Sequence, residues 1–268
     1  MLVIVERHST KDVEIERFRD VPPARPPRHD GQRKMHEAVT RTRKKALATD
    51  IGAASVDTES PARSDLPLQI IEAALEQFGR FGFDGASTRE IARASGTAMS
   101  SITYHFGSKE GLYLACADHI ASVVGSIYAP LIAIIEKQPP QTPAQARTQM
   151  LALLETLARF LLSSRSATFA QFVAREQQHP TEAFTRLYDG LIGPLVETAI
   201  LLSAVARPSL AEAERRPLIL HIMGMALILR LGRACVVRTM QVPDLDSATG
   251  EALVASLLKS AETLLTEE

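Results

Sequence analysis

The chain contains little cysteine, with only Cys116 and Cys235 among its 268 residues. Two cysteines this far apart form neither a CxxC pair nor a disulfide framework, and both lie in apolar, helix-like patterns. We therefore expect two buried, reduced thiols and a fold that depends on a hydrophobic core. Hydrophobic residues make up 46% of the sequence, which is sufficient for such a core.

Long apolar runs are scarce as well. The N-terminal stretch from Met1 to Val5 ends at Glu6 and is shorter than a signal peptide. A second stretch, residues 218–229, contains His221 and is shorter than the roughly 20 residues that a membrane-spanning helix needs. The sequence thus predicts a soluble, cytoplasmic protein with no membrane partner.

An excess of charge of one sign is also missing, because 30 Lys and Arg residues stand against 31 Asp and Glu residues, for a formal net charge of -1. Any affinity for nucleic acid must then come from a local basic surface rather than from the charge of the whole molecule.

Residue patterns typical of enzymes are absent from the sequence. It has no nucleophile elbow, no glycine-rich phosphate loop and no cluster of metal ligands. One Glu-x-x-His pair, Glu176 and His179, lacks the second pair that a helical di-metal site requires. We predict that the chain is not an enzyme and has no catalytic residue, cofactor or metal ion.

Residues 1–64 differ in composition from the rest of the chain. Prolines cluster between residues 22 and 27, and eight basic residues lie between 25 and 45 against only Asp30 and Glu37. No apolar period is present there, so we expect a disordered basic extension. Two interpretations stay open: an arm that adds phosphate contacts, or a segment without that role, which is either a solvated tail or upstream sequence that is not translated because Met35 is the true start.

Helical periodicity begins at Leu66 and continues to the end of the chain. Prolines mark the main breaks, because proline cannot continue a helix. The expected helices are 66–82, 88–95, 99–106, 108–137, 143–163, 167–178, 181–204, 209–238, with a break or kink at Pro217, and 247–266. The fold class is therefore all-α, with a three-helix domain in residues 65–112 and a larger helical domain in residues 113–268.

The three-helix domain has the layout of a helix-turn-helix. Ser87 and Glu90 have the spacing of a capping box, in which the serine hydroxyl accepts from the Glu90 amide and the Glu90 carboxylate reaches back. Gly96 then supplies the left-handed conformation that a tight turn between two helices needs. We expect one helix to start at residue 88 and a second to follow the turn.

The second of these helices presents a small, polar outer face. With Ile102 facing inward, a rotation of about 100° per residue turns four side chains outward: Ser100, Ser101, Thr103 and Tyr104. Small hydroxyl side chains let a helix lie deep in the major groove of DNA, although an ordinary solvated helix has the same pattern. His105 lies on the flank, where it is well placed for a phosphate.

The segment that follows strengthens the DNA-binding interpretation. Ser108 is suited to cap a new helix whose free amides point toward the outward face, and Lys109 lies in its first turn. A helix N-terminus combined with a lysine forms a phosphate clamp.

These motifs together resemble the TetR/AcrR family of bacterial regulators over roughly residues 66–120. The matching segments are Ser87-Thr-Arg-Glu-Ile-Ala92, Gly96, and Ile102-Thr-Tyr-His-Phe-Gly-Ser-Lys-Glu-Gly-Leu112. The resemblance implies a sequence-specific DNA-binding transcriptional regulator, and we expect a ligand-responsive repressor. It also implies phosphate or base contacts from Ser87, Thr88 and Arg89, phosphate contact from Lys109, and a recognition surface made of Ser100, Ser101, Thr103, Tyr104 and His105. Rival interpretations are a non-sequence-specific architectural DNA-binding protein and a small helical enzyme.

The sequence departs from the family pattern at several positions. Thr97 and Ala98 replace the usual residues after the turn glycine, and Thr103 stands where the family usually has tyrosine, so we favour Tyr104 for the aromatic contact to phosphate. The recognition helix also lacks Arg and Lys, which removes bidentate guanine reading from within it. Arg89 is the best candidate for that role.

The C-terminal half contains a shorter match, Phe172-Val-Ala-Arg-Glu176 and His179-Pro-Thr-Glu-Ala-Phe184, which resembles the CecR-like branch of the family. The resemblance implies a small, apolar or drug-like effector and control of efflux genes. Aromatic and isolated polar residues in apolar surroundings are the candidate ligand contacts: Tyr113, Phe169, Phe172, Arg175 and His221. Each has a structural alternative: the aromatics are core, Arg175 pairs with Glu176 or Glu182, and His221 is a satisfied core histidine.

The last two helices are apolar enough to form a four-helix interface between two subunits. A homodimer places two recognition helices about 34 Å apart, which matches a palindromic double-stranded DNA operator. We further expect a ligand in the larger domain to shift the helix that begins near Ser108, because this helix belongs to both domains.

Overall fold

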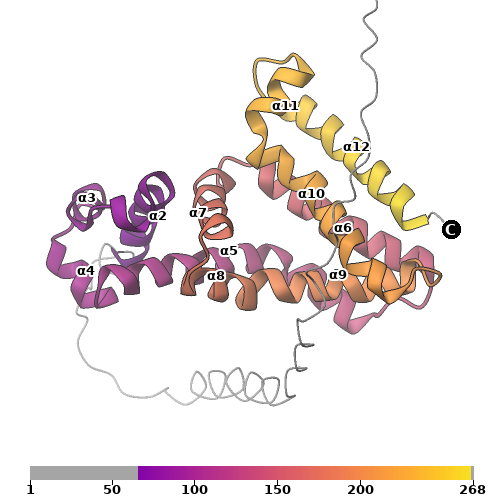
Figure 1. Cartoon of the computed structure of the whole chain (residues 1–268), viewed down its shortest axis with the longest axis horizontal. Coiled ribbons are helices and arrows are strands. Elements are labelled where there is room, and N and C mark those ends of the chain that lie inside the picture. The colour runs from indigo at the N-terminus through magenta and orange to yellow at the C-terminus, as the bar shows by residue number, and fades with distance from the viewer. Residues whose placement is uncertain (1–65, 267–268) are drawn as a thin grey trace, which may run out of the picture. The chain divides into compact units, whose positions relative to one another are not determined.

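The computed structural model describes residues 66–266 of the chain, all of which belong to one compact unit. The predicted basic extension, residues 1–64, and its two interpretations lie outside the described residues. The described part consists of helices without a strand, which confirms the all-α prediction. Figure 1 shows how they are arranged.

The helix bounds follow the expected order along the chain. They are α2 (Leu66–Gly85), α3 (Thr88–Ala94), α4 (Met99–Phe106), α5 (Lys109–Lys137), α6 (Pro143–Leu162), α7 (Ser166–Gln178), α8 (Glu182–Leu187), the π-helix η2 (Tyr188–Ile192), α9 (Gly193–Ala206), α10 (Glu212–Leu231), α11 (Arg233–Met240) and α12 (Ser247–Thr266).

Helices α2 and α4 pack on the N-terminal half of α5, and α3 packs on α2 and α4 (Figure 1). Ile70, Phe78 and Ile91 are fully buried between them, and Ile102 on α4 is 3% exposed. We call α2, α3 and α4 the three-helix domain. The long helix α5 continues from it and packs against α6 and α8, so one helix joins both parts of the described chain.

The break in the helix expected at 209–238 lies at Gly232 rather than at Pro217. Helix α10 continues through Pro217, which is its sixth residue, because a proline this close to the start of a helix removes only one hydrogen bond. At Gly232 the axis turns by 83° between α10 and α11. A Cβ atom at Gly232 would lie 2.7 Å from Cγ1 of Ile228, so the turn requires glycine.

The helix expected at 181–204 is divided into α8, η2 and α9. The amide of Gly193 donates to the carbonyl of Tyr188, five residues earlier, as in a π-helix. Pro194 follows directly and has no amide to offer to Gly190. The wider turn accommodates this missing donor without ending the helical path.

The expectation of two buried thiols is wrong for one of them. Cys116 is fully buried, whereas Cys235 is exposed. The reason is the turn at Gly232, which directs α11 away from α10, so that α11 has no buried residue. Burial raises the pKa of the Cys116 thiol and keeps it protonated.

Two helical segments, Lys109–Lys137 and Glu182–Ala206, are long and apolar enough to cross a membrane, and the bent pair α10 and α11 passes the same test as one broken span. The first two segments exceed the 218–229 stretch on which the sequence argument rested. In the structure α5 packs against α2 and α8, and α9 against α6 and α10. This packing supports the prediction of no membrane partner, which stays a prediction.

Burial predicts different roles for two nearby phenylalanines of α2. Phe78 is fully buried, whereas Phe81 is 51% exposed and lies under the Arg80 guanidinium at 5.4 Å. Phe78→Ala leaves a cavity and is expected to lower the free energy of unfolding by about 3 to 5 kcal/mol. Phe81→Ala is expected to lower it by less than about 1 kcal/mol. Urea unfolding of both variants measures the difference, and equal losses would contradict this placement of α2.

Candidate nucleic-acid interface

The first turn of α3 places two arginines in different environments. Ser87 caps the helix and accepts from the Glu90 amide at 3.5 Å. The Glu90 carboxylate does not reach back to Ser87 as expected, because it accepts from Nε and Nη2 of Arg93 at 2.9 and 2.7 Å. Arg93 is thereby paired, whereas exposed Arg89 makes no ion pair among the described residues.

The turn between α3 and α4 depends on Gly96, whose φ is 64°. A Cβ atom there would have no neighbour within 4 Å, so the turn is open to solvent and glycine is needed for its dihedral angle alone. Gly107, which caps the C-terminal end of α4, also has a positive φ, of 76°. A short helix, a glycine turn and a second short helix form a helix-turn-helix.

The outer face of α4 agrees with the rotation argument. Ile102 faces the core, and four neighbours are exposed: Ser100, Thr103, Tyr104 and His105. Tyr104 is 85% exposed, and its ring meets that of His105 edge to face at 5.0 Å. Ser101 is half-buried and lies at the edge of the face. The surface is hydroxyl-rich and carries no Lys or Arg.

Met99, the first residue of α4, is a residue that the sequence argument missed. The rotation places it about 60° from Ile102, close to the buried side. The structure leaves the Met99 side chain 49% exposed. The turn before it, which contains Gly96 and Ala98, is itself exposed and does not shield it from solvent. The N-terminal residues of a recognition helix are those that meet base edges, and a thioether is suited to the methyl group of thymine.

The start of α5 is adjacent to this face. The Ser108 hydroxyl accepts from the amide of Gly111 at 3.1 Å and caps the helix. Lys109 Nζ donates to the carbonyl of Asp84 at 3.3 Å and lies 4.8 Å from the centre of the Phe83 ring. Hydrogen bonds to its own backbone amide and to Ser108 lower the pKa of Glu110. The ammonium group is thus held beside the end of α2, next to the helix N-terminus.

The structure brings four of the five candidate ligand contacts together near α7. The Tyr113 ring lies 4.6 Å from that of Phe172 and 4.8 Å from that of Phe78, and Phe83 lies 5.2 Å away. We call Phe78, Phe83, Tyr113 and Phe172 the aromatic cluster. Phe169 and Arg175 lie one turn to either side of Phe172 on α7, and His221 is exposed on α10, outside the cluster.

A buried carboxylate adjoins the cluster. Glu176 is 1% exposed and accepts from the Tyr113 hydroxyl at 2.5 Å. Its other oxygen accepts from the amide and the hydroxyl of Thr181, at 3.0 and 2.9 Å. Burial, and then the acceptor and the charge of Glu176, raise the pKa of Tyr113, so this hydroxyl remains a donor.

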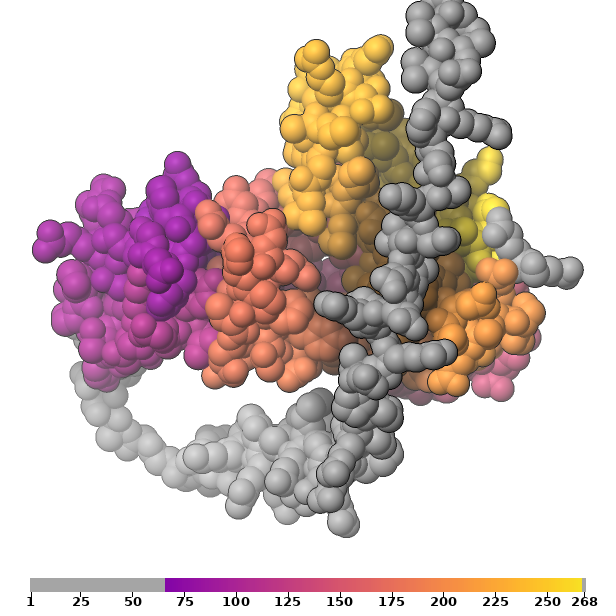
Figure 2. Space-filling view, in the orientation of Figure 1, coloured from indigo at the N-terminus to yellow at the C-terminus, as the bar shows by residue number. Residues whose placement is uncertain are grey.

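Arg175 does not pair with Glu176 or Glu182, the partners considered from the sequence. Its guanidinium donates to two backbone carbonyls of α2, those of Gly79 and Arg80. The difference follows from tertiary packing, since α7 lies alongside α2 (Figure 2).

His119 on α5 lies beside α7, with its ring 6.0 Å from that of Phe169. Its partial burial lowers its pKa, and the charge of Arg165 lowers it further, against the opposing effect of Glu72. The imidazole therefore favours its neutral form among its apolar neighbours.

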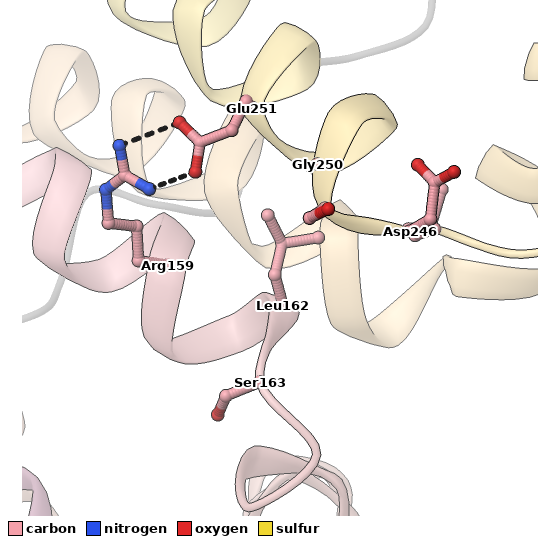
Figure 3. Close-up of a pocket in the computed structure, with 8 residues that line it drawn as sticks. Arg159, Leu162, Ser163, Asp246, Gly250 and Glu251 are labelled. Carbon is pink, nitrogen blue, oxygen red and sulfur yellow. Dashed lines mark hydrogen bonds and ion pairs between the residues drawn. The ribbon is translucent and has the colours of Figure 1, made fainter.

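The surface of the larger domain is hollowed at the ends of several of its helices, and two of these hollows bear on the candidate contacts. One, of about 310 Å³, lies where the end of α6 meets the start of α12, and Arg159 faces Glu251 there in a two-bonded ion pair (Figure 3). The other, of about 410 Å³, is lined by the Gln138–Gln141 turn and by Gln145 and Gln149. None of the five candidate ligand contacts lines either hollow.

The three-helix domain, with an exposed α4 and a capped α5, defines a helix-turn-helix DNA-binding protein. The family model for bacterial regulatory proteins of the tetR family matches residues 70–116. The model for the C-terminal domain of the HTH-type transcriptional dual regulator CecR matches residues 146–266. The chain belongs to the TetR family, and its C-terminal domain is of the CecR type. It is a transcriptional regulator.

Curated relatives agree with this assignment. The HTH-type transcriptional dual regulator CecR of Shigella flexneri is 36% identical over 174 residues, which cover 63% of this chain and 77% of that protein. The HTH-type transcriptional regulator RutR of Escherichia coli K12 is 29% identical over 136 residues, which cover 42% of this chain and 64% of that protein.

Solved structures share the fold at low identity. The fatty acid degradation regulator FadR from Bacillus halodurans has a TM-score of 0.53 at 17% identity, over 78% of this chain and 97% of that one. FadR from Bacillus subtilis, in complex with stearoyl-CoA, has a TM-score of 0.51 at 16% identity, over 74% of this chain and 97% of that one.

The placement of Lys109 predicts a contact to phosphate that is independent of DNA sequence. Lys109→Ala is expected to weaken binding to specific and random duplexes alike. It should also reduce the slope of log affinity against log salt concentration by about 1, the loss of one phosphate contact. Lys137→Ala, at the opposite end of α5, is the matched control and should change neither. Titrations at several salt concentrations measure the slope, and unchanged binding by Lys109→Ala would remove the phosphate assignment.

Proposed function

We propose that the chain is a homodimeric, ligand-responsive repressor that binds a palindromic operator. The observation that carries the proposal is the exposed face of α4 without Lys or Arg, preceded in the chain by Arg89 at the start of α3 and followed by Lys109 at the start of α5. Residues 65–112 are the DNA-binding part, and residues 113–268 bind the effector and the second subunit. The protein acts in the cytoplasm and is not an enzyme.

The proposed DNA contacts divide by chemistry. Positioning contacts to phosphate come from the start of α3 and from the start of α5, through Ser87, Thr88 and Lys109. Bidentate recognition of guanine is typical of Arg and Lys, and α4 contains neither. Arg89 at the start of α3 is therefore proposed to contact a guanine edge. The contacts to bases and to the groove are proposed to come from four exposed residues of α4 and from half-buried Ser101. These residues are Ser100, Ser101, Thr103, Tyr104 and His105.

The effector is proposed to be a small apolar or drug-like molecule. The fold supports this, since the FadR structure from Bacillus subtilis, which has the same fold, holds stearoyl-CoA. The side chains of Phe169, Phe172 and Arg175 on α7, and of Tyr113 on α5, whose ring contacts that of Phe172, are the proposed contacts, with His221 as a further one on α10. In the described state these aromatics are packed in the core, so a ligand would have to displace core contacts.

This arrangement supports a mechanical coupling between ligand and DNA. Tyr113 lies one turn after Lys109 on the same helix, and it contacts both α2 and α7. A ligand that moves α7 would therefore move the start of α5 and change the separation of the two α4 helices. A coupling free energy of about 1 to 3 kcal/mol, typical of allostery, weakens operator binding by roughly 5- to 150-fold.

The experiment that tests the function is selection of DNA fragments that the full chain retains, followed by competition against random duplex at one salt concentration. A repressor of this kind is expected to recover one palindromic sequence and to bind it at least about 1,000-fold more tightly than random DNA. An architectural DNA-binding protein, the second candidate, would recover no common sequence. Ser101→Ala should change the preferred bases, whereas Lys109→Ala should not.

The homodimer is proposed to form through α10 and α12. Three large apolar side chains on one side of α10, Leu220, Ile228 and Leu231, are 62%, 50% and 59% exposed. The buried face of α12 packs against α6, and its outer face carries small residues such as Ala252, which permit close approach of a second chain. An apolar stripe of this kind is typical of a subunit interface.

The dimer proposal predicts the effect of charge on this stripe. The double variant Leu220→Glu with Ile228→Glu places two carboxylates in the proposed apolar interface and is expected to convert the protein to a monomer. Ile134→Glu on α5, at a residue with 51% exposure, is the matched control and should leave the dimer intact. Sedimentation equilibrium measures the mass, and a double variant that remains dimeric would place the interface elsewhere.

A further inference from the structure

Helix α2 is interrupted before its end. Gly82 has φ 75° and ψ 179°, which is not a helical conformation. In an uninterrupted helix the carbonyls of Gly79 and Arg80 accept from amides four residues later. The turn at Gly82 redirects the chain at the point from which those amides would come, so both carbonyls require another donor.

Arg175 of α7 supplies that donor. Its Nε donates to the Gly79 carbonyl at 2.8 Å, and its Nη2 donates to the Arg80 carbonyl at 2.6 Å. The planar guanidinium presents these donors at a fixed angle, so two adjacent bonds fix the direction of α7 relative to α2. A positive charge at this position is also favourable, because the carbonyl end of a helix is partly negative.

Two glycines on α2 make room for this contact. A Cβ atom at Gly82 would lie 3.2 Å from Nη1 of Arg175, and one at Gly79 would lie 3.1 Å from Cβ of Gln171. Glycine at residues 79 and 82 therefore allows α7 to approach the backbone of α2 closely. Their spacing of three residues places both on one side of the helix.

The residue that follows Arg175 anchors the same turn to the rest of the protein. Glu176 binds Tyr113 of α5 and Thr181 at the start of α8. Both ends of the connection are thus held: Arg175 to the three-helix domain, and Glu176 to α5 and α8. A movement of α2 against α7 must break the Arg175 bonds or displace a buried carboxylate.

We infer that Arg175 is a positioning residue for DNA binding, which holds the three-helix domain at the angle in which the two α4 helices of a dimer reach successive major grooves. The inference rests on the proposed dimeric function. Arg175 touches no DNA in this role and acts through the backbone of α2. Its loss should loosen the angle of the domain while leaving the surface that contacts DNA unchanged.

Half-site spacing provides a readout that separates positioning from stability. The probes are the duplex selected by the wild-type chain and versions with one base pair added or removed between the half-sites. Each base pair rotates one half-site by about 35° and shifts it by about 3.4 Å. Wild-type protein should prefer the selected spacing. In Arg175→Ala this preference is expected to fall about tenfold, a factor that corresponds to about 1.4 kcal/mol, with affinity for a single half-site unchanged.

Two further variants keep the test decisive. Arg175→Lys retains the charge but not the forked donors, so it should restore only part of the preference, and it replaces the alanine variant if that one does not fold. Arg186→Ala, which removes an exposed ion pair between α8 and Asp118 on α5, is the matched control and should keep the wild-type profile. An unchanged preference in folded Arg175 variants, or an equal loss at all spacings, would overturn the inference. A wild-type site with only one half-site would instead contradict the dimeric function itself.

Discussion

The burial of one tyrosine ring is the contact on which the connection between the two domains depends. Tyr113 projects from α5 between Phe78 and Phe83 of α2 on one side and Phe172 of α7 on the other. Since these rings come from both domains, a single core residue packs against both. The hydroxyl in such a site needs an acceptor, and the buried Glu176 meets that need. The carboxylate in turn is stabilised by Thr181, which begins α8.

The DNA-binding surface separates affinity from specificity. Its centre, the outer face of α4, is rich in hydroxyl groups and carries no Lys or Arg, whereas Arg89 precedes it in the first turn of α3 and Lys109 follows it at the start of α5. In the proposed DNA complex these two charges would contribute affinity that depends on salt and little on sequence. Under the proposed function, sequence would be read by the short side chains and the exposed Met99 of α4, and by Arg89. A near-neutral chain can bind DNA in this way because only the local charge matters.

The sequence predicted what local chemistry determines. Gly96, the Ser87 cap, the Ser108 cap and the burial of Ile102 depend on residues within one or two helical turns, and the structure agrees with each. For the same reason, the bounds predicted for α4 and α5 agree with the observed ones to within one residue. The function could be predicted as well, because the residues of the family motif lie together in this segment, within residues 70–116.

Predictions that depended on contacts between distant residues failed. Arg175 binds the backbone of α2 almost a hundred residues away rather than Glu176 or Glu182. Cys235 is exposed because α11 turns at Gly232, where a side chain would collide with Ile228. In each case the residue pattern permits several partners, and only the packing of helices chooses among them.

The central claim is that the three-helix domain and the C-terminal domain are held in one fixed arrangement by the aromatic cluster and the Arg175 contact. The most direct measurement is the distance between spin labels introduced by Glu76→Cys on α2 and Thr148→Cys on α6, in a Cys235→Ser background and diluted with unlabelled chain. Both labelled side chains are exposed. The account predicts one narrow distance distribution that broadens when Phe172→Ala is added. A distribution that is already broad without that substitution, or one that Phe172→Ala leaves unchanged, would contradict it.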